Sequence, residues 1–230
     1  MGFSRYQVGV APRVLSGIER ATLVRRTYAL VFVGIITTIL GTAFTATQPA
    51  LQNAVLAHPF LTMIAWFAPL LVAQSQARAF PRNIILTLLF TFITGIMLAP
   101  VLLAYLQYEP GALAEAGVLT FSTFGILTLY ATFSRRDFSA WGGFFSVGVV
   151  VLIITMIVGM FFPSVGASMW ISAAGVFIFA GLLVFDTWRI TRSGRFTDQD
   201  YVFAAVTIFL DLLNLFLFIL SLVGGGDRRR

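Results

Sequence analysis

The sequence contains no cysteine and no lysine, and its only histidine is His58. Without cysteine there is no disulfide, no thiolate metal ligand and no cysteine nucleophile. Without lysine a retinal Schiff base cannot form, which excludes a seven-helix retinal protein. A single histidine also excludes a zinc hydrolase site built from three histidines. Charged residues of any kind are scarce, at 10% of the chain.

The residues that are abundant are apolar, at 59% of 230 residues, with 24 Phe and 20 Gly. A soluble domain of this length cannot bury so much apolar surface, so we predict a single all-α integral membrane domain. A spanning helix needs about 20 mostly apolar residues. Seven segments qualify, at 27–47, 60–77, 83–106, 112–133, 141–162, 168–191 and 200–223. We therefore predict a cytoplasmic N-terminal segment (1–26), a seven-helix transmembrane domain (27–223) and a C-terminal tail (224–230).

All 15 basic residues are arginines, and twelve of them lie in the N-terminal segment and in alternate connections. The other three connections between the predicted spans carry none, which indicates a cytoplasmic N-terminus. These twelve are Arg5, Arg13, Arg20, Arg25, Arg26, Arg78, Arg82, Arg135, Arg136, Arg189, Arg192 and Arg195. Because they stand at helix ends, their partner is membrane lipid and not nucleic acid.

The tail 224–230 carries the remaining three arginines, and seven spans place it outside. Either the last segment is re-entrant or the tail is translocated despite its charge; we favour seven spans. The outer connections are short and the chain has no Asn-x-Ser/Thr sequon. These features favour a bacterial inner membrane.

Two acids lie inside the last two apolar segments, Asp186 in one and Asp211 in the other. A carboxylate at bilayer depth costs at least about 2.5–3.5 kcal/mol, so such acids are usually functional. Two carboxyl groups in contact titrate as one unit, because both cannot ionise cheaply. We predict a proton- and cation-sensing site on a transport path. The alternative is that each acid merely bonds a Ser, Thr, Trp or Arg within the bundle.

The connection between these segments predicts an antiparallel hairpin. Gly194 is a plausible helix C-cap, and Thr197 with Asp200 resembles a capping box. Along its helix, Asp186 lies about 10 Å from this connection, and Asp211 lies about 20 Å from it. Contact therefore requires the last helix to begin further out, or the two helices to tilt.

Paired carboxylate oxygens are suitable ligands for calcium, so Asp186 and Asp211 are its candidate ligands. Asn214 lies on the same helix face as Asp211 and would add an oxygen. The chain also needs a cation to oppose Asp186. Arg78 is the candidate, as a latch that closes the inner mouth until protonation breaks its ion pair, with Arg82 as the alternative.

The other arginines at the inner side of the helices, Arg135, Arg136, Arg189 and Arg192, are interpreted as membrane anchors. His58 is assigned to an outer loop. An intramembrane aspartyl protease also uses one Asp on each of two helices, but its Gly-x-Gly-Asp motif is absent before Asp211. We expect no enzyme activity and no cofactor other than calcium as a permeant or bound ion.

At these residues the sequence resembles the Bax inhibitor-1 family, most closely its bacterial members. The specific segments are FDTWRI (185–190) and YVFAAVTIFLDLLNLFLFIL (201–220), supported by FTFITGIMLAP (90–100) and TFSRRDFSAWGGFF (132–145). The resemblance implies six helices in two layers around a central C-terminal helix. It also implies a pH-sensitive calcium leak governed by an aspartate pair and an arginine latch on the second helix. A role as a regulator that binds a membrane-bound ATP-dependent protease, or other stress machinery, is the alternative that the resemblance suggests.

Overall fold

Every element in the described part of the chain is an α-helix. The computed structural model describes residues 17–75, 79–161, 169–192, 196–197 and 199–227. The helices are α1 (Gly17–Ala46), α2 (Pro49–Ala57), α3 (Pro59–Ser75), α4 (Arg82–Tyr108), α5 (Pro110–Phe133), α6 (Ser139–Phe161), α8 (Met169–Arg192) and α9 (Tyr201–Asp227). The all-α prediction is confirmed, and each predicted span overlaps one of these helices.

Six helices within the described ranges are individually long and apolar enough to cross a membrane: α1, α4, α5, α6, α8 and α9. The segments Pro49–Ala57 and Pro59–Val72 qualify only as a pair, and they are bent by 100° at their junction. Prolines begin both α2 and α3, where their missing N–H costs no hydrogen bond. The chain is therefore a multi-pass membrane protein with six spans, or seven if the bent pair is one span.

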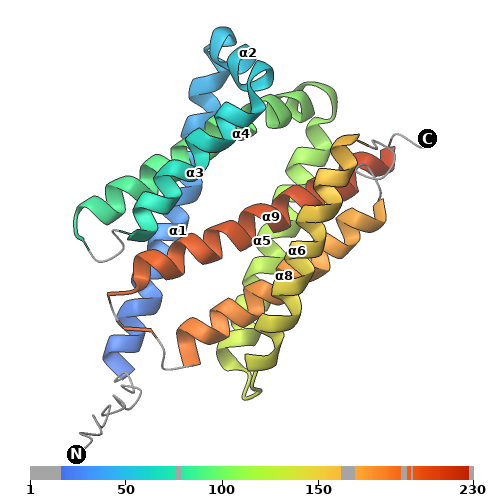
Figure 1. Cartoon of the computed structure of the whole chain (residues 1–230). Helices are drawn as coiled ribbons and strands as arrows, with labels where there is room; N and C mark the ends of the chain where they lie inside the picture. The colour runs from blue at the N-terminus through green and yellow to red at the C-terminus, as the bar shows by residue number, and fades with distance from the viewer. Residues whose placement is uncertain (1–16, 76–78, 162–168, 193–195, 198, 228–230) are drawn as a thin grey trace, which may run out of the picture.

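The last helix, α9, lies between two groups of helices, with α1, α3 and α4 on one side and α5, α6 and α8 on the other (Figure 1). It contacts α1 and α4 from the first group and α5 and α8 from the second. Half of the residues in its most apolar 18-residue stretch are buried. This is the largest share among the six helices that are long and apolar enough to cross a membrane. This central position agrees with the arrangement that the family resemblance implied.

Apolar side chains cover the outside of the bundle, while threonines line part of its inside. Phe32, Phe144 and Trp170 are more than 60% exposed. Such exposure is favourable in lipid, where helix association depends on close packing and on interhelical hydrogen bonds. The most extensive contact between two helices joins α1 and α4. Across it, the Oγ1 hydroxyl of Thr38 donates a hydrogen bond to the backbone carbonyl of Thr91 at 3.0 Å.

Glycine makes this approach of α1 and α4 possible. A Cβ at Gly95 would overlap the carbonyl oxygen of Thr38, and one at Gly41 would overlap the carbonyl of Phe92. Two further glycines allow close packing between other helices. Gly142 and Gly181 face the rings of Phe185 and Phe145, respectively.

The helix ends differ from the predicted boundaries in three places. α1 begins at Gly17, inside the segment 1–26, because helical hydrogen bonding continues beyond the apolar run. α2 occupies a stretch that was expected to be a loop. α9 extends to Asp227, past the predicted end at residue 223. Gly224 packs there against Tyr105, which a larger residue would prevent.

The arginines of the described residues gather at one end of the bundle. The start of α1, the α5–α6 connection and the α8–α9 connection lie at the lower and left side of Figure 1, and the end of α9 lies at the opposite side. Arg20, Arg82, Arg135 and Arg192 belong to the first end. The alternation of arginine-rich and arginine-free connections therefore corresponds to two chemically different ends.

Candidate functional site

Asp186 of α8 and Asp211 of α9, called the acid pair below, are in contact. Both residues are only 5% exposed, and their side chains are within hydrogen-bonding range of each other. Asp186 lies six residues before the end of α8 and Asp211 ten residues after the start of α9. Their contact therefore requires α9 to be displaced along α8 or tilted against it, the two alternatives that the count from the connection left open.

The hairpin that holds the acid pair is fixed at both ends. At the connection, Oδ2 of Asp200 accepts hydrogen bonds from the backbone N–H and the hydroxyl of Thr197, each at 2.8 Å. This is one half of the predicted capping box, with the carboxylate reaching back to the capping residue. Gly194 lies outside the described residues. At the far end, the hydroxyls of Ser172 and Ser221 are 2.8 Å apart.

A hydrogen bond between two carboxyl groups requires a proton on one of them, because two carboxylates are both acceptors. Within the described chain, no N–H or O–H group reaches Oδ2 of Asp211, although that atom is buried. A proton shared with Asp186, or a bound cation, would satisfy this oxygen. The geometry thus allows a site whose charge changes with its protonation.

The cation beside the acid pair is Arg189, which the sequence analysis interpreted as a membrane anchor. Its Nη1 lies 3.4 Å from Oδ1 of Asp186. Its guanidinium also lies 5.0–5.8 Å from three ring centroids, where ring faces attract a cation. The rings are those of Phe185, Phe196 and Phe203. The i, i+3 spacing from Asp186 is the signal that identifies this pair in the sequence.

The proposed latch residues are placed differently. Arg78 lies outside the described residues. Arg82 is the exposed first residue of α4, and within the described residues Asp186 forms its ion pair with Arg189. The side-chain nitrogen of Asn214 donates to the carbonyl of Leu210 at 2.7 Å, so it is bonded to its own helix.

A further polar contact from α1 flanks the acid pair. The hydroxyl groups of Tyr28 and Thr187 are 3.2 Å apart, and Thr187 is the neighbour of Asp186 in the chain. The ring of Tyr28 packs edge-on against Phe124 of α5. Sequence analysis missed this tyrosine, because nothing in its local pattern indicates a contact with a residue 159 positions away.

The sequence of this chain fits one known family over nearly its whole length. A family model described as "Inhibitor of apoptosis-promoting Bax1" matches residues 20–228. The chain belongs to the Bax inhibitor-1 family. The two segments on which the resemblance was based, 185–190 and 201–220, both lie within the matched range and carry the acid pair.

Proteins similar to this chain occur in eukaryotes, bacteria and viruses. Bax inhibitor 1 of Schizosaccharomyces pombe is 29% identical over 209 residues, which cover 89% of this chain and 77% of the relative. An uncharacterized protein of Deinococcus radiodurans is 30% identical over 217 residues, covering 90% and 91%. The Golgi anti-apoptotic protein of vaccinia virus is 27% identical over 213 residues, covering 91% and 88%.

In this Bax inhibitor-1 family member, the described residues place no third His, Cys, Asp or Glu side chain beside the acid pair to complete a metal site. The described residues contain no group of three or more His, Cys, Asp or Glu side chains placed to hold a metal ion. Calcium takes six to eight oxygen ligands, and two carboxylates supply at most four. A calcium ion at the acid pair would keep water or backbone carbonyls as ligands, which suits an ion in transit.

Proposed function

We propose that this protein is a calcium-permeable leak channel whose opening depends on the protonation of the acid pair. The observation that carries the proposal is the contact between Asp186 and Asp211, two buried acids on neighbouring helices. One of these helices, α9, contacts both groups of helices in the bundle. A change in the charge of the pair is therefore applied to the helix that joins the two groups.

The charge repulsion within the acid pair is of the size that such a switch requires. Two unit charges about 4 Å apart repel by about 4 kcal/mol at the effective dielectric constant typical of protein sites. A ratio of two states changes from 1:99 to 99:1 for about 5.5 kcal/mol. Removing the shared proton thus supplies most of the energy needed to change the preferred arrangement of α8 and α9, and calcium can then approach two carboxylates.

Arg189 opposes the charge of the pair in this proposal. Its ion pair with Asp186 persists while one negative charge remains, and it weakens when Asp186 is neutralised. The original assignment of the latch to Arg78, or alternatively to Arg82, stays a prediction beside it. The two assignments are compatible. Arg189 would balance the charge of the acid pair from α8, and a separate arginine on the second span would hold the closed state.

The membrane setting is part of the proposal. We take α2 and α3 as one bent span, which gives seven spans and places the two chain ends on opposite sides. The arginine-rich end faces the cytoplasm by the positive-inside rule. The bacterial relatives support a bacterial inner membrane as the location.

Calcium flux into vesicles that contain the purified protein tests this function. We expect flux that changes with pH, and we expect Asp211→Asn to abolish the pH dependence, because an amide cannot release a proton in this range. Glu115→Gln is the matched control, since Glu115 is an exposed acid at the start of α5. If Asp211→Asn and Glu115→Gln both retain the pH response of the original protein, the mechanism is wrong.

A role as a regulator of a membrane-bound ATP-dependent protease or of other stress machinery is the second candidate. The contact surface would be the basic, partly polar first 26 residues, of which Arg25 and Arg26 are exposed. Co-purification with and without residues 1–20 separates the two functions, because ion flux should not require those residues. Intramembrane proteolysis is disfavoured, since α9 continues as a regular helix through Asp211 and leaves no opened backbone for a substrate.

A further inference from the structure

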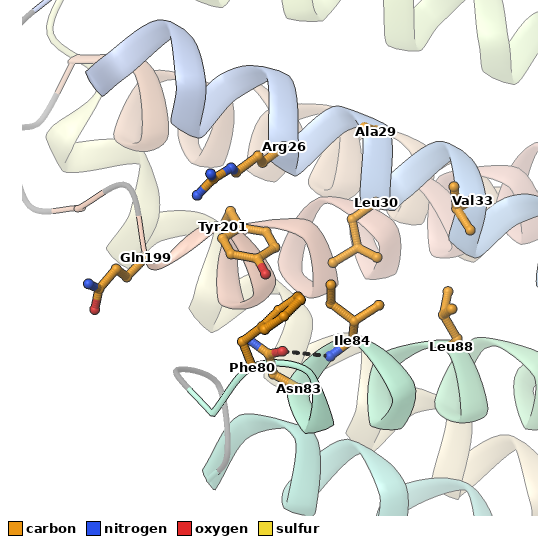
Figure 2. Close-up of a pocket in the computed structure, with 10 residues that line it drawn as sticks. All are labelled: Arg26, Ala29, Leu30, Val33, Phe80, Asn83, Ile84, Leu88, Gln199 and Tyr201. Atoms are coloured by element: carbon orange, nitrogen blue, oxygen red, sulfur yellow. Dashed lines mark hydrogen bonds between the residues drawn. The ribbon is translucent and has the colours of Figure 1, made fainter. Parts of the chain in front are cut away.

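A cavity of about 690 Å³ opens at the arginine-rich end of the bundle, and its lining does not include the acid pair (Figure 2). It lies between the first half of α1, the beginning of α4 and the beginning of α9. Its lining consists of Arg26, Ala29, Leu30, Val33, Phe80, Asn83, Ile84, Leu88, Gln199 and Tyr201. None of these residues takes part in the proposed gating.

The lining changes from polar to apolar along the helix axis. Arg26, Tyr201 and Gln199 lie at one end in Figure 2, where the helices begin. Val33 and Leu88 lie toward the other end, deeper in the spans. From Arg26 to Val33 the wall extends by about 10 Å at 1.5 Å per residue. The cavity therefore suits a molecule with one polar end and one hydrocarbon end.

Arg26 gives the polar end its charge. Its guanidinium lies over the ring of Tyr201, 5.6 Å from the centroid, a contact with the ring face that leaves N–H groups at its edge able to donate. The ten residues that line the cavity include no acid. The polar end thus favours an anion.

We propose that this cavity binds an anionic phospholipid, with the phosphate on Arg26 and an acyl chain along Leu30, Val33 and Leu88. The position at the arginine-rich end corresponds to the headgroup region of one leaflet, where basic pockets between helices hold anionic headgroups. A free phosphate would use the arginine but not the apolar wall. A zwitterionic lipid would use the wall but offer no net charge to the arginine.

The headgroup contact is tested with Arg26→Gln and with Arg25→Gln as its control. Arg25 is the adjacent residue and is equally exposed, but it does not line the cavity. Retention of phosphatidylglycerol by the detergent-purified protein is measured by native mass spectrometry across a titration. We expect Arg26→Gln to weaken binding about tenfold, the loss of one charge-assisted contact, and Arg25→Gln to leave it unchanged.

The acyl-chain contact is tested with Val33→Trp, which fills the apolar part of the cavity. Ile36→Trp is its control, because Val33 is 40% exposed and Ile36 41% exposed on the same helix, and only Val33 lines the cavity. We expect only Val33→Trp to reduce phosphatidylglycerol binding.

Two competitors identify the ligand class. Phosphatidylcholine with the same acyl chains and inorganic phosphate should each fail to displace bound phosphatidylglycerol. The proposal is overturned if phosphatidylcholine binds equally well, if inorganic phosphate displaces the lipid, or if neither Arg26→Gln nor Val33→Trp differs from its control.

Discussion

The guanidinium of Arg189 lies 3.4 Å from the carboxylate of Asp186, one turn away on the same face of α8. Because both residues belong to one helix, this ion pair does not depend on how α8 packs against α9. The contact of Asp186 with Asp211 does depend on that packing. Asp186 thus has one partner fixed by its own helix and one that a movement of the helices can remove.

Replacing Arg189 by Gln should change the pH response of calcium flux. A neighbouring cation favours the ionised form of a carboxyl group, so its removal favours the protonated form. A higher pH is then needed to release the shared proton, and the midpoint of the flux should rise by about one pH unit. Arg192→Gln is the control, because Arg192 ends the same helix and donates to the carbonyl of Thr132 instead. Equal shifts in both variants would contradict the role given to Arg189.

Replacing Gly95 by Ala should destabilise the contact between α1 and α4. The added Cβ would overlap the backbone carbonyl of Thr38, so the helices must separate, at a cost of about 1–3 kcal/mol. Thermal unfolding in detergent measures this loss. Gly125→Ala is the control, since Gly125 lies on α5 with open space around it, and its replacement should be neutral or slightly stabilising. A Gly95→Ala protein as stable as this control would show that the two helices are not so close.

Replacing Asp200 by Ala should weaken the start of α9. The substitution removes the acceptor of two hydrogen bonds from Thr197, and the loss of a helix cap costs about 0.5–2 kcal/mol. The thermal unfolding midpoint should fall, while Gln199→Ala, at an exposed neighbouring position, should leave it nearly unchanged. Equal stability of the two variants would mean that the cap contributes nothing.

Replacing Ser172 and Ser221 together by Cys should create a disulfide. Their hydroxyl oxygens are 2.8 Å apart, and a disulfide joins sulfurs at about 2.05 Å. The natural chain has no cysteine, so the engineered thiols have no competing partner. Mass spectrometry after mild oxidation should show the intramolecular bond, whereas Ser172→Cys with Ser139→Cys should not form one. Failure of the first pair to cross-link would show a different register of α8 on α9.

The sequence was sufficient for six of the seven predicted spans and for singling out the two buried acids, since both follow from the cost of placing polar groups in lipid. Asp186 and Asp211 were recognisable because each is isolated in a long apolar run. Their contact was recognisable as a possibility only, because a helical count cannot give the displacement of α9 along α8. The hydrogen bonds of Asp200 with Thr197 follow the predicted local spacing, but they form one half of the capping box and precede α9, which begins at Tyr201.

Features that depend on distant contacts were not predicted. Arg189 was interpreted as an anchor because its position at a helix end fits the positive-inside rule equally well, and its aromatic neighbours Phe196 and Phe203 follow only from the fold. α2 was missed because nine residues between two prolines fall below the length of a spanning segment. The extension of α9 was missed because three consecutive glycines ordinarily favour the end of a helix.

The central place of α9 has a consequence for how the protein is made. The ribosome synthesises this helix after α1 to α8, so these helices leave the ribosome before the helix that contacts both groups. Most of the surface that joins the groups forms only when Tyr201–Asp227 arrives. Closure of the bundle is therefore a late event of biogenesis, and a nascent chain that stops before Tyr201 remains open along its middle.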